Sequence, residues 1–315
     1  MSPVALETLK GKIVFSSGKD GDYDIWRLDL PSGTLTQLTA TAGLWNDSPR
    51  WSPDGTQVLF TSNRTGVPEV WVMDERGSDQ RPVTASGKYH RTPDWTPDGR
   101  AFVCAANYDG DQFDLYLLDL NGRQPPRRLT DHPGSDYAPH VASDSRSMVF
   151  TSDRSGNLDI WKQELKRQEA TRLTTHQAPD YSPRFSPDGR QIAFVSERRH
   201  ALEPSSDLYV MNADGSQVRR LTSNAGIDRF VAWSPDAQYW IYTSARPRRL
   251  AERLMLLPVS GGRPVEVSID REPLEAEIGA FPEAVGLFTL LPRAVIRRCY
   301  PDTYFGTERA PDWAA

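Results

Sequence analysis

Cysteine is scarce in this sequence, with two residues, Cys104 and Cys299, among 315. Two cysteines cannot form the disulfide framework that stabilises many small secreted domains. Long apolar runs are also missing, and no stretch approaches the roughly 20 residues that a membrane helix needs. We therefore predict a protein that does not insert into a membrane.

A secretory signal is missing as well, because the first twelve residues show no basic start followed by an apolar core. As it stands, the sequence is typical of a cytoplasmic protein. A periplasmic protein whose signal has been removed is the alternative.

An excess of positive charge is lacking too, since 37 Lys and Arg residues face 42 Asp and Glu residues, for a net charge of −5. Nucleic-acid-binding proteins usually carry a strongly basic face, so we expect no nucleic-acid partner. The chain has no Gly-rich phosphate loop between a strand and a helix, and no Gly-x-Ser-x-Gly elbow. These absences argue against nucleotide, kinase and hydrolase chemistry, and we expect no cofactor.

What the chain does contain is a repeat of about 45 residues, visible in three sequence tracks. The first is a Trp-Ser-Pro-Asp-Gly segment, found in complete or altered form at residues 51–55, 95–99, 141–145, 185–189 and 233–237. The second is an Asp-Ile-Trp-like segment, at residues 24–26, 69–71, 114–116, 159–161 and 207–209. The third is an Arg-Leu-Thr-like segment, at residues 37–39, 82–84, 128–130, 172–174 and 220–222. Three tracks in one register indicate a repeat architecture.

Each repeat unit predicts four short strands. In the second unit they are a strand that ends at Trp51, then residues 57–62, 69–74 and 80–84, and Pro-Asp-Gly and other Gly-containing segments form the turns. The strands are rich in β-branched and aromatic residues, which suit a pleated buried surface. We expect the aromatic residues to pack between neighbouring units: Phe15, Trp51, Phe60, Trp95, Phe150, Phe185, Phe194, Trp233 and Tyr242. Four strands per unit predict an all-β fold, a β-propeller.

Counting units gives five complete blades and one incomplete blade. We predict six blades within residues 1–270, with seven as the alternative. The first blade lacks a clear innermost strand, which either residues 3–8 or the tail of residues 271–315 must supply. Within that tail, Ile278 and Gly279 resemble a decayed innermost strand, and later residues allow a partial extra blade.

The three tracks together resemble the TolB-type propeller repeat, a WD40-like repeat, over about residues 11–267. The same repeat occurs in the propellers of prolyl-oligopeptidase-like peptidases and of the tricorn protease. Blade sequence begins by Ile13, which leaves no room before it for the N-terminal domain of TolB, and too little chain remains for a peptidase domain. The resemblance therefore implies an isolated propeller, which we expect to be non-catalytic rather than an enzyme. Its implied function is a monomeric scaffold for a protein partner.

Polar residues are expected where the chain enters each innermost strand, around the mouth of the central channel. The mouth of a propeller channel is concave and lined by several blades, which makes it the default ligand site. Asp136, Asp180 and Asp228 are equivalent in three successive blades and either bind a cation or a cationic group of a partner, or cap their own turns. The predicted channel-mouth residues are Asp47, His90, Arg91, Asp136, Tyr137, Asp180, Tyr181, Asp228 and Arg229.

Four histidines near the entrance segments raise a metal hypothesis: His90, His132, His140 and His176. Histidine clusters can ligate a divalent metal, and oligogalacturonate lyase, a propeller enzyme with a related repeat, uses a His-rich metal site. This gives the alternative function of a metal-dependent polysaccharide lyase, and a channel-mouth ligand sensor is a further alternative. However, His132 and His176 occupy the same repeat position, for which a turn role suffices. We therefore predict no metal site.

Five arginines stand in lengthened loops of the last two blades: Arg198, Arg199, Arg246, Arg248 and Arg249. Arginine binds carboxylates and phosphates through two parallel hydrogen bonds and is enriched at interface anchors. We predict that these residues form a partner-binding basic patch, and a solvated rim is the alternative.

Overall fold

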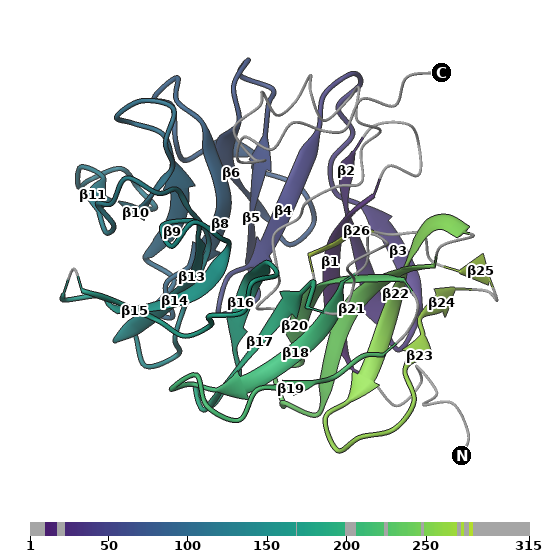
Figure 1. The fold of residues 1–315 in the computed structure, drawn as a ribbon. Helices are drawn as coiled ribbons and strands as arrows, with labels where there is room; N and C mark the ends of the chain where they lie inside the picture. The colour runs from purple at the N-terminus through teal and green to yellow at the C-terminus, as the bar shows by residue number, and fades with distance from the viewer. Residues whose placement is uncertain are drawn as a thin grey trace, which may run out of the picture.

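The computed structural model describes residues 10–17, 23–167, 169–198, 206–223, 226–246, 249–269, 272–273 and 277–279. These residues form six four-stranded antiparallel sheets arranged as blades around a ring (Figure 1). They form no helix, and so none that is long and apolar enough to cross a membrane. The prediction of an all-β, six-bladed propeller is confirmed.

The second to sixth blades are each built from four consecutive strands, with the first strand innermost. The second blade comprises β4 (Asn46–Trp51), β5 (Gln57–Ser62), β6 (Glu69–Asp74) and β7 (Arg81–Pro82), and the third β8 (His90–Trp95), β9 (Ala101–Ala106), β10 (Asp114–Asp119) and β11 (Arg127–Arg128). The fourth comprises β12 (Asp136–Val141), β13 (Ser147–Ser152), β14 (Asp159–Glu164) and β15 (Ala170–Arg172). The fifth comprises β16 (Asp180–Phe185), β17 (Gln191–Ser196), β18 (Asp207–Asn212) and β19 (Arg219–Arg220), and the sixth β20 (Ile227–Trp233), β21 (Tyr239–Arg246), β22 (Arg249–Pro258) and β23 (Val265–Glu266). A separate pair, β24 (Ser268–Ile269) and β25 (Glu272–Pro273), follows them.

The first blade takes its innermost strand from the far end of the chain. It contains β1 (Gly11–Ser17), β2 (Asp24–Leu30) and β3 (Thr34–Gln37), and β26 (Glu277–Gly279) pairs with β1. This tail segment is the decayed strand that the sequence offered as one of two candidates. The pairing joins the two ends of the ring, so that β1 is not left as an open edge.

The ring is closed by side chains as well as by this pairing. Phe15 and Trp26 of the first blade share one buried cluster with Phe230, Ile241 and Leu254 of the sixth blade. Fully burying a large apolar side chain contributes about 1.5–3 kcal/mol, so this interface is a main source of closure.

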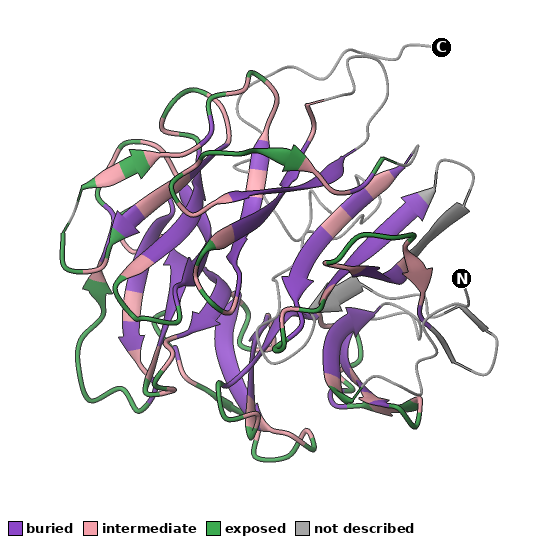
Figure 2. Cartoon of the chain, turned by 90° about the horizontal axis from the view of Figure 1, so that it is seen from below, coloured by how far each residue is buried: buried purple, intermediate pink, exposed green. Residues whose placement is uncertain are grey.

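The other blade interfaces are apolar in the same way. Between the first two blades, Val14 and Ile25 pack with Trp51, Phe60 and Trp71. All nine aromatic residues predicted to pack between blades are buried. Figure 2 shows that burial runs along the strands while the loops are exposed.

The outermost strands are shorter than predicted. The sequence pattern suggested residues 80–84, but β7 covers only Arg81–Pro82. Beyond it, the backbone N–H groups of Val83 and Thr84 both donate to the Val70 carbonyl, at 2.8 and 3.3 Å, so the ladder ends there.

Beyond the end of the ladder, side-chain hydrogen bonds hold the outer strand to its neighbour. The residues that form them belong to the second and third sequence tracks. In the fourth blade the Thr174 hydroxyl accepts from the Ile160 N–H at 2.9 Å and donates to Asp159 at 3.2 Å. Arg172 donates to the same carboxylate at 2.6 Å. The Asp-Ile-Trp and Arg-Leu-Thr segments are thus two halves of one contact, which fixes the outer strand on its blade.

Candidate functional site

A β-bulge shapes the innermost strands of five successive blades. In β4, Asp47 pairs with Thr61 and Arg50 pairs with Leu59, so the strand contains one extra residue. Ser48 sits in the bulge at a φ of 54°. The same position has positive φ in the other four strands, at Thr92, Ala138, Ser182 and Phe230.

The bulge places the second and fifth residues of β4, β8, β12 and β16 on the same face, and we give the same position names to the third and sixth residues of β20, which begins one residue earlier. Thr61 and Leu59 are two residues apart and share a face of β5, so their partners Asp47 and Arg50 do as well. The second positions are Asp47, Arg91, Tyr137, Tyr181 and Arg229, and the fifth positions are Arg50, Asp94, His140, Arg184 and Ala232. Five predicted channel-mouth residues therefore occupy one structural position around the ring.

The fifth positions meet in the centre of the ring. Arg184 of the fifth blade lies 3.9 Å from Asp94 of the third blade, although the fourth blade separates them in sequence. Arg50 of the second blade approaches the same carboxylate at 3.5 Å. His140 of the fourth blade lies between these blades and accepts a hydrogen bond from the Phe185 N–H at 3.2 Å. We call Arg50, Asp94, His140 and Arg184 the waist cluster.

Burial dominates the electrostatics of the waist cluster. Arg50 and Arg184 are each 1% exposed. Burial, and then the charge of Arg184, lowers the pKa of Arg50. Burial raises the pKa of Asp94 against the opposing effect of the two arginines. Burial, and then the charges of Arg184 and Arg50, lowers the pKa of His140, so its ring is held neutral.

The second positions of the fifth and sixth blades form a more accessible group near the strand entrances. The Tyr181 hydroxyl donates to Glu197 at 3.3 Å, and the charge of Arg229 acts on both residues. All three side chains are half-buried. Burial raises the pKa of Tyr181 to about 12 and raises the pKa of Glu197. We call Tyr181, Glu197 and Arg229 the mouth cluster.

Sequence reasoning identified Tyr181 and Arg229 but not Glu197. Glu197 opens a lengthened loop and is not part of a repeated track, so its only signal was its place directly after β17.

The predicted aspartates at the strand entrances are engaged within their own blades. Arg154 donates to Asp136 at 2.6 Å, and Arg198 donates to Asp180 at 2.7 Å. Each arginine also lies over an aromatic ring, with Arg154 5.0 Å from the centroid of Trp161. The carboxylates are therefore held by arginine side chains rather than by backbone groups of a turn. For Asp228, which is 1% exposed, burial raises the pKa.

The third blade replaces this ion pair by a histidine contact. His90 Nδ1 lies 2.8 Å from Glu69, and His90 Nε2 lies 2.8 Å from the Tyr108 hydroxyl. Glu69 also accepts from the Thr84 hydroxyl and from the Gly87 N–H. Both ring nitrogens of His90 are thus engaged, and His90 and Glu69, from neighbouring blades, are buried.

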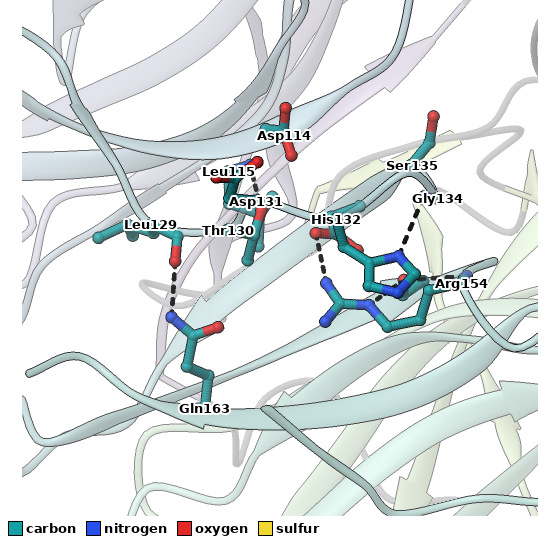
Figure 3. A network of polar contacts seen from close by, with 12 residues as sticks. Asp114, Leu115, Leu129, Thr130, Asp131, His132, Gly134, Ser135, Arg154 and Gln163 are labelled. Carbon is teal, nitrogen blue, oxygen red and sulfur yellow. Dashed lines mark hydrogen bonds and ion pairs between the residues drawn. The ribbon is translucent and has the colours of Figure 1, made fainter. Parts of the chain in front are cut away.

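His132 and His176 have a turn role in the structure. The Nδ1 atom of His132 accepts from the Gly134 N–H at 3.1 Å, and that of His176 accepts from the Ala178 N–H at 3.0 Å. Figure 3 shows the bond between the His132 ring and Gly134 of the same loop. Within the described part of the chain, no group of three or more His, Cys, Asp or Glu residues has the arrangement of a metal site.

Of the five arginines predicted as a basic patch, only Arg198 has a described side chain, and it pairs with Asp180. Arg246 and Arg249 are opposite each other in the β21–β22 ladder, where their backbone alone is described. Arg199 and Arg248 lie outside the described residues. A patch built from all five residues stays a prediction.

Comparison with known families gives two matches. A family described as "TolB beta propeller domain" matches residues 10–113 and 90–203, which together span more than half of the chain. A family described as "Tricorn protease N-terminal beta propeller domain" matches residues 157–280.

Two curated relatives show similarity over part of their length. The Tol-Pal system protein TolB of Bordetella pertussis is 37% identical over 123 residues, which are 39% of this chain and 28% of that protein. A TolB homologue of Chlorobium luteolum is 30% identical over 153 residues, which are 49% of this chain and 34% of that protein. The matched segments thus span about a third of these relatives.

Solved structures share the fold at low sequence identity. A putative TolB from Agrobacterium tumefaciens has a TM-score of 0.71 at 22% identity and covers 88% of this chain and 99% of its own. TolB from Acinetobacter baumannii has a TM-score of 0.71 at 21% identity over 86% and 65% of the two chains. An oligogalacturonate lyase in complex with manganese has a TM-score of 0.54 at 16% identity over 83% and 74%. Identities this low support a common architecture and nothing about activity.

Proposed function

Because this chain belongs to the TolB β-propeller domain family, we propose that it is a monomeric, non-catalytic scaffold that binds a protein partner at the channel mouth. Two of its relatives are named as proteins of a Tol-Pal system. By analogy with them, the partner we propose is a component of such an assembly.

The observation that carries this proposal is the mouth cluster. Tyr181, Glu197 and Arg229 lie on two adjacent blades, are half-buried, and combine an aromatic ring with one acidic and one basic group. Tyrosine and arginine are enriched among residues that dominate binding energy, because each offers apolar area together with directional hydrogen bonds. Half-burial also means that little side-chain freedom is lost when a partner covers them.

The histidine cluster that a metal-dependent lyase would need is not assembled among the described residues. His90, His132 and His176 each use a ring nitrogen in a contact within the protein. We therefore favour binding over turnover.

A photo-crosslinking amino acid at position 181 tests the proposal in the native host. We expect a crosslinked protein from position 181 and none from position 188, which lies in an exposed Pro-Asp-Gly turn at the other end of the fifth blade. The Arg229→Glu variant should lose the crosslink, because reversing one charge of the mouth cluster disturbs the pairing across the interface. Equal crosslinking from both positions, or a crosslink that survives Arg229→Glu, would contradict a partner site at the mouth.

A further inference from the structure

The waist cluster lies deeper in the channel than the mouth cluster and is not needed for the binding proposed above. Its two arginines come from blades two and five and converge on the single carboxylate of Asp94, at 3.5 and 3.9 Å. Neutral His140 adds no charge, since burial lowers its pKa. The cluster therefore holds one more positive charge than Asp94 balances.

The hydrogen bonds of Arg50 are incomplete. Its Nη1 atom donates to the Pro49 carbonyl at 3.1 Å. Its Nη2 atom is buried and has no hydrogen-bond partner among the described residues. A buried donor on a charged group loses hydration when the protein folds and regains it only by pairing, so such groups are rarely left without a partner.

Among the described residues, two carboxylates act on the guanidinium group of Arg50. Asp47 is the other carboxylate that raises the pKa of Arg50, and its effect is smaller than that of Asp94. Across the second and fifth positions of the five bulged strands, four arginines (Arg50, Arg91, Arg184 and Arg229) face two aspartates (Asp47 and Asp94). These ten strand positions therefore carry more positive than negative side chains, although the net charge of the chain is −5.

We propose that the waist cluster is a binding site for a monovalent anion of halide size, held by Arg50 Nη2 and the positive charge of Arg184. One negative charge balances the excess at the waist, and guanidinium groups are weakly hydrated and suited to buried anion contacts. Each member of the waist cluster is buried, with 6% or less of the residue exposed, so the ligand we propose is a small ion.

Thermal unfolding of the full chain tests this proposal in sodium chloride and in sodium gluconate at equal ionic strength. A ligand that binds only the folded state raises the unfolding temperature, so we expect wild type to gain at least about 2 °C in chloride over gluconate. Salts also act on the whole protein surface. We call the increase in unfolding temperature from gluconate to chloride the chloride gain. The decisive comparison is between two proteins, and the chloride gain should be larger for wild type than for Arg50→Met.

Arg64→Met is the matched control. Arg64 is also a partly buried arginine of the second blade, but it donates to Asn46 at 2.8 Å and lies 4.5 Å from the centroid of Trp71. We expect it to keep the full chloride gain. If Arg50→Met does not fold, Arg50→Lys serves instead, and it should show a reduced gain because it lacks the second N–H arm.

Crystals grown in sodium bromide give a second, direct measurement. We expect an anomalous peak within about 3.5 Å of Arg50 Nη2, which is the range of an N–H to anion contact. A channel without a peak in wild-type crystals, or an equal chloride gain in wild type and Arg50→Met, would overturn the proposal.

Discussion

The guanidinium group of Arg184 and the carboxylate of Asp94 lie 3.9 Å apart across the innermost strand of an intervening blade. Such a contact requires both side chains to point into the centre of the ring. It arises because each innermost strand carries a bulge that turns its fifth residue to the same face as its second. Charged side chains from three blades therefore meet at the waist of the ring, and the half-buried mouth cluster lies nearer the strand entrances.

The ion pair between Arg154 and Asp136 should be a large contributor to stability. Asp136 is fully buried, so Arg154→Met leaves a carboxylate without its partner, which we expect to lower the free energy of unfolding by about 3–5 kcal/mol. Urea unfolding measures the change. Arg167→Met is the control. The side chains of Arg167 and Glu164 are 70% and 60% exposed, so losing this ion pair should change the free energy of unfolding by less than about 1 kcal/mol. Equal effects of the two substitutions would argue against the buried pair.

The threonine of the third sequence track should act through its hydroxyl. Thr174→Val keeps the shape but leaves the Ile160 N–H without its acceptor, so we expect a loss of about 1–3 kcal/mol in the free energy of unfolding. Thr171→Val, on the exposed side of β15, should change it by less than about 0.5 kcal/mol. A Thr174→Val protein as stable as wild type would show that the track has another role.

His140 should make the folded protein sensitive to acid. Its pKa is lowered by burial and by the two arginines, so the unfolded chain takes up a proton below about pH 6.5 that the folded chain does not. The free energy of unfolding should then fall with decreasing pH, by up to about 1.4 kcal/mol per unit from this residue alone. His140→Asn, which can still accept from the Phe185 N–H, should remove this component between pH 7.5 and 5.5. If the free energy of unfolding changes equally with pH in wild type and His140→Asn, the prediction is contradicted.

The strand β26 should be needed for ring closure. A chain ending at Asp270 loses this strand and exposes the edge of β1, whereas a chain ending at Gly279 retains it. We expect the shorter chain to unfold at a lower temperature and to self-associate, since an unpaired strand edge recruits other strands. Thermal unfolding and light scattering on both chains make the comparison. If the two chains have the same unfolding temperature and the same light scattering, ring closure does not depend on β26.

Much of the fold could be predicted from the sequence, because every blade repeats the same local chemistry. The predicted strands 57–62 and 69–74 agree with β5 and β6 to the residue. The closing strand was harder to assign, since Ile278 and Gly279 belong to none of the three tracks. Their role depends on pairing with β1, more than 260 residues earlier, and local sequence does not encode such a partner.

The candidate site was less predictable, because it depends on which way side chains point. A regular strand would place Asp47 and Arg50 on opposite faces, and the bulge at Ser48 leaves no clear sequence signal. The waist cluster was therefore missed, apart from His140. Asp136 and Asp180 were identified as ring residues, but their partners Arg154 and Arg198 lie 18 residues away, and only the blade geometry brings each pair together.

The most direct test of the proposed function is the dissociation constant of the crosslinked partner, measured with purified wild type, Arg229→Glu and Arg190→Glu. Arg190 is the control, because its side chain is 84% exposed next to the Pro-Asp-Gly turn of the same blade, away from the mouth. We predict that Arg229→Glu weakens binding at least about tenfold, whereas Arg190→Glu changes it less than about twofold. Equal affinities for all three proteins would contradict a partner site at the channel mouth.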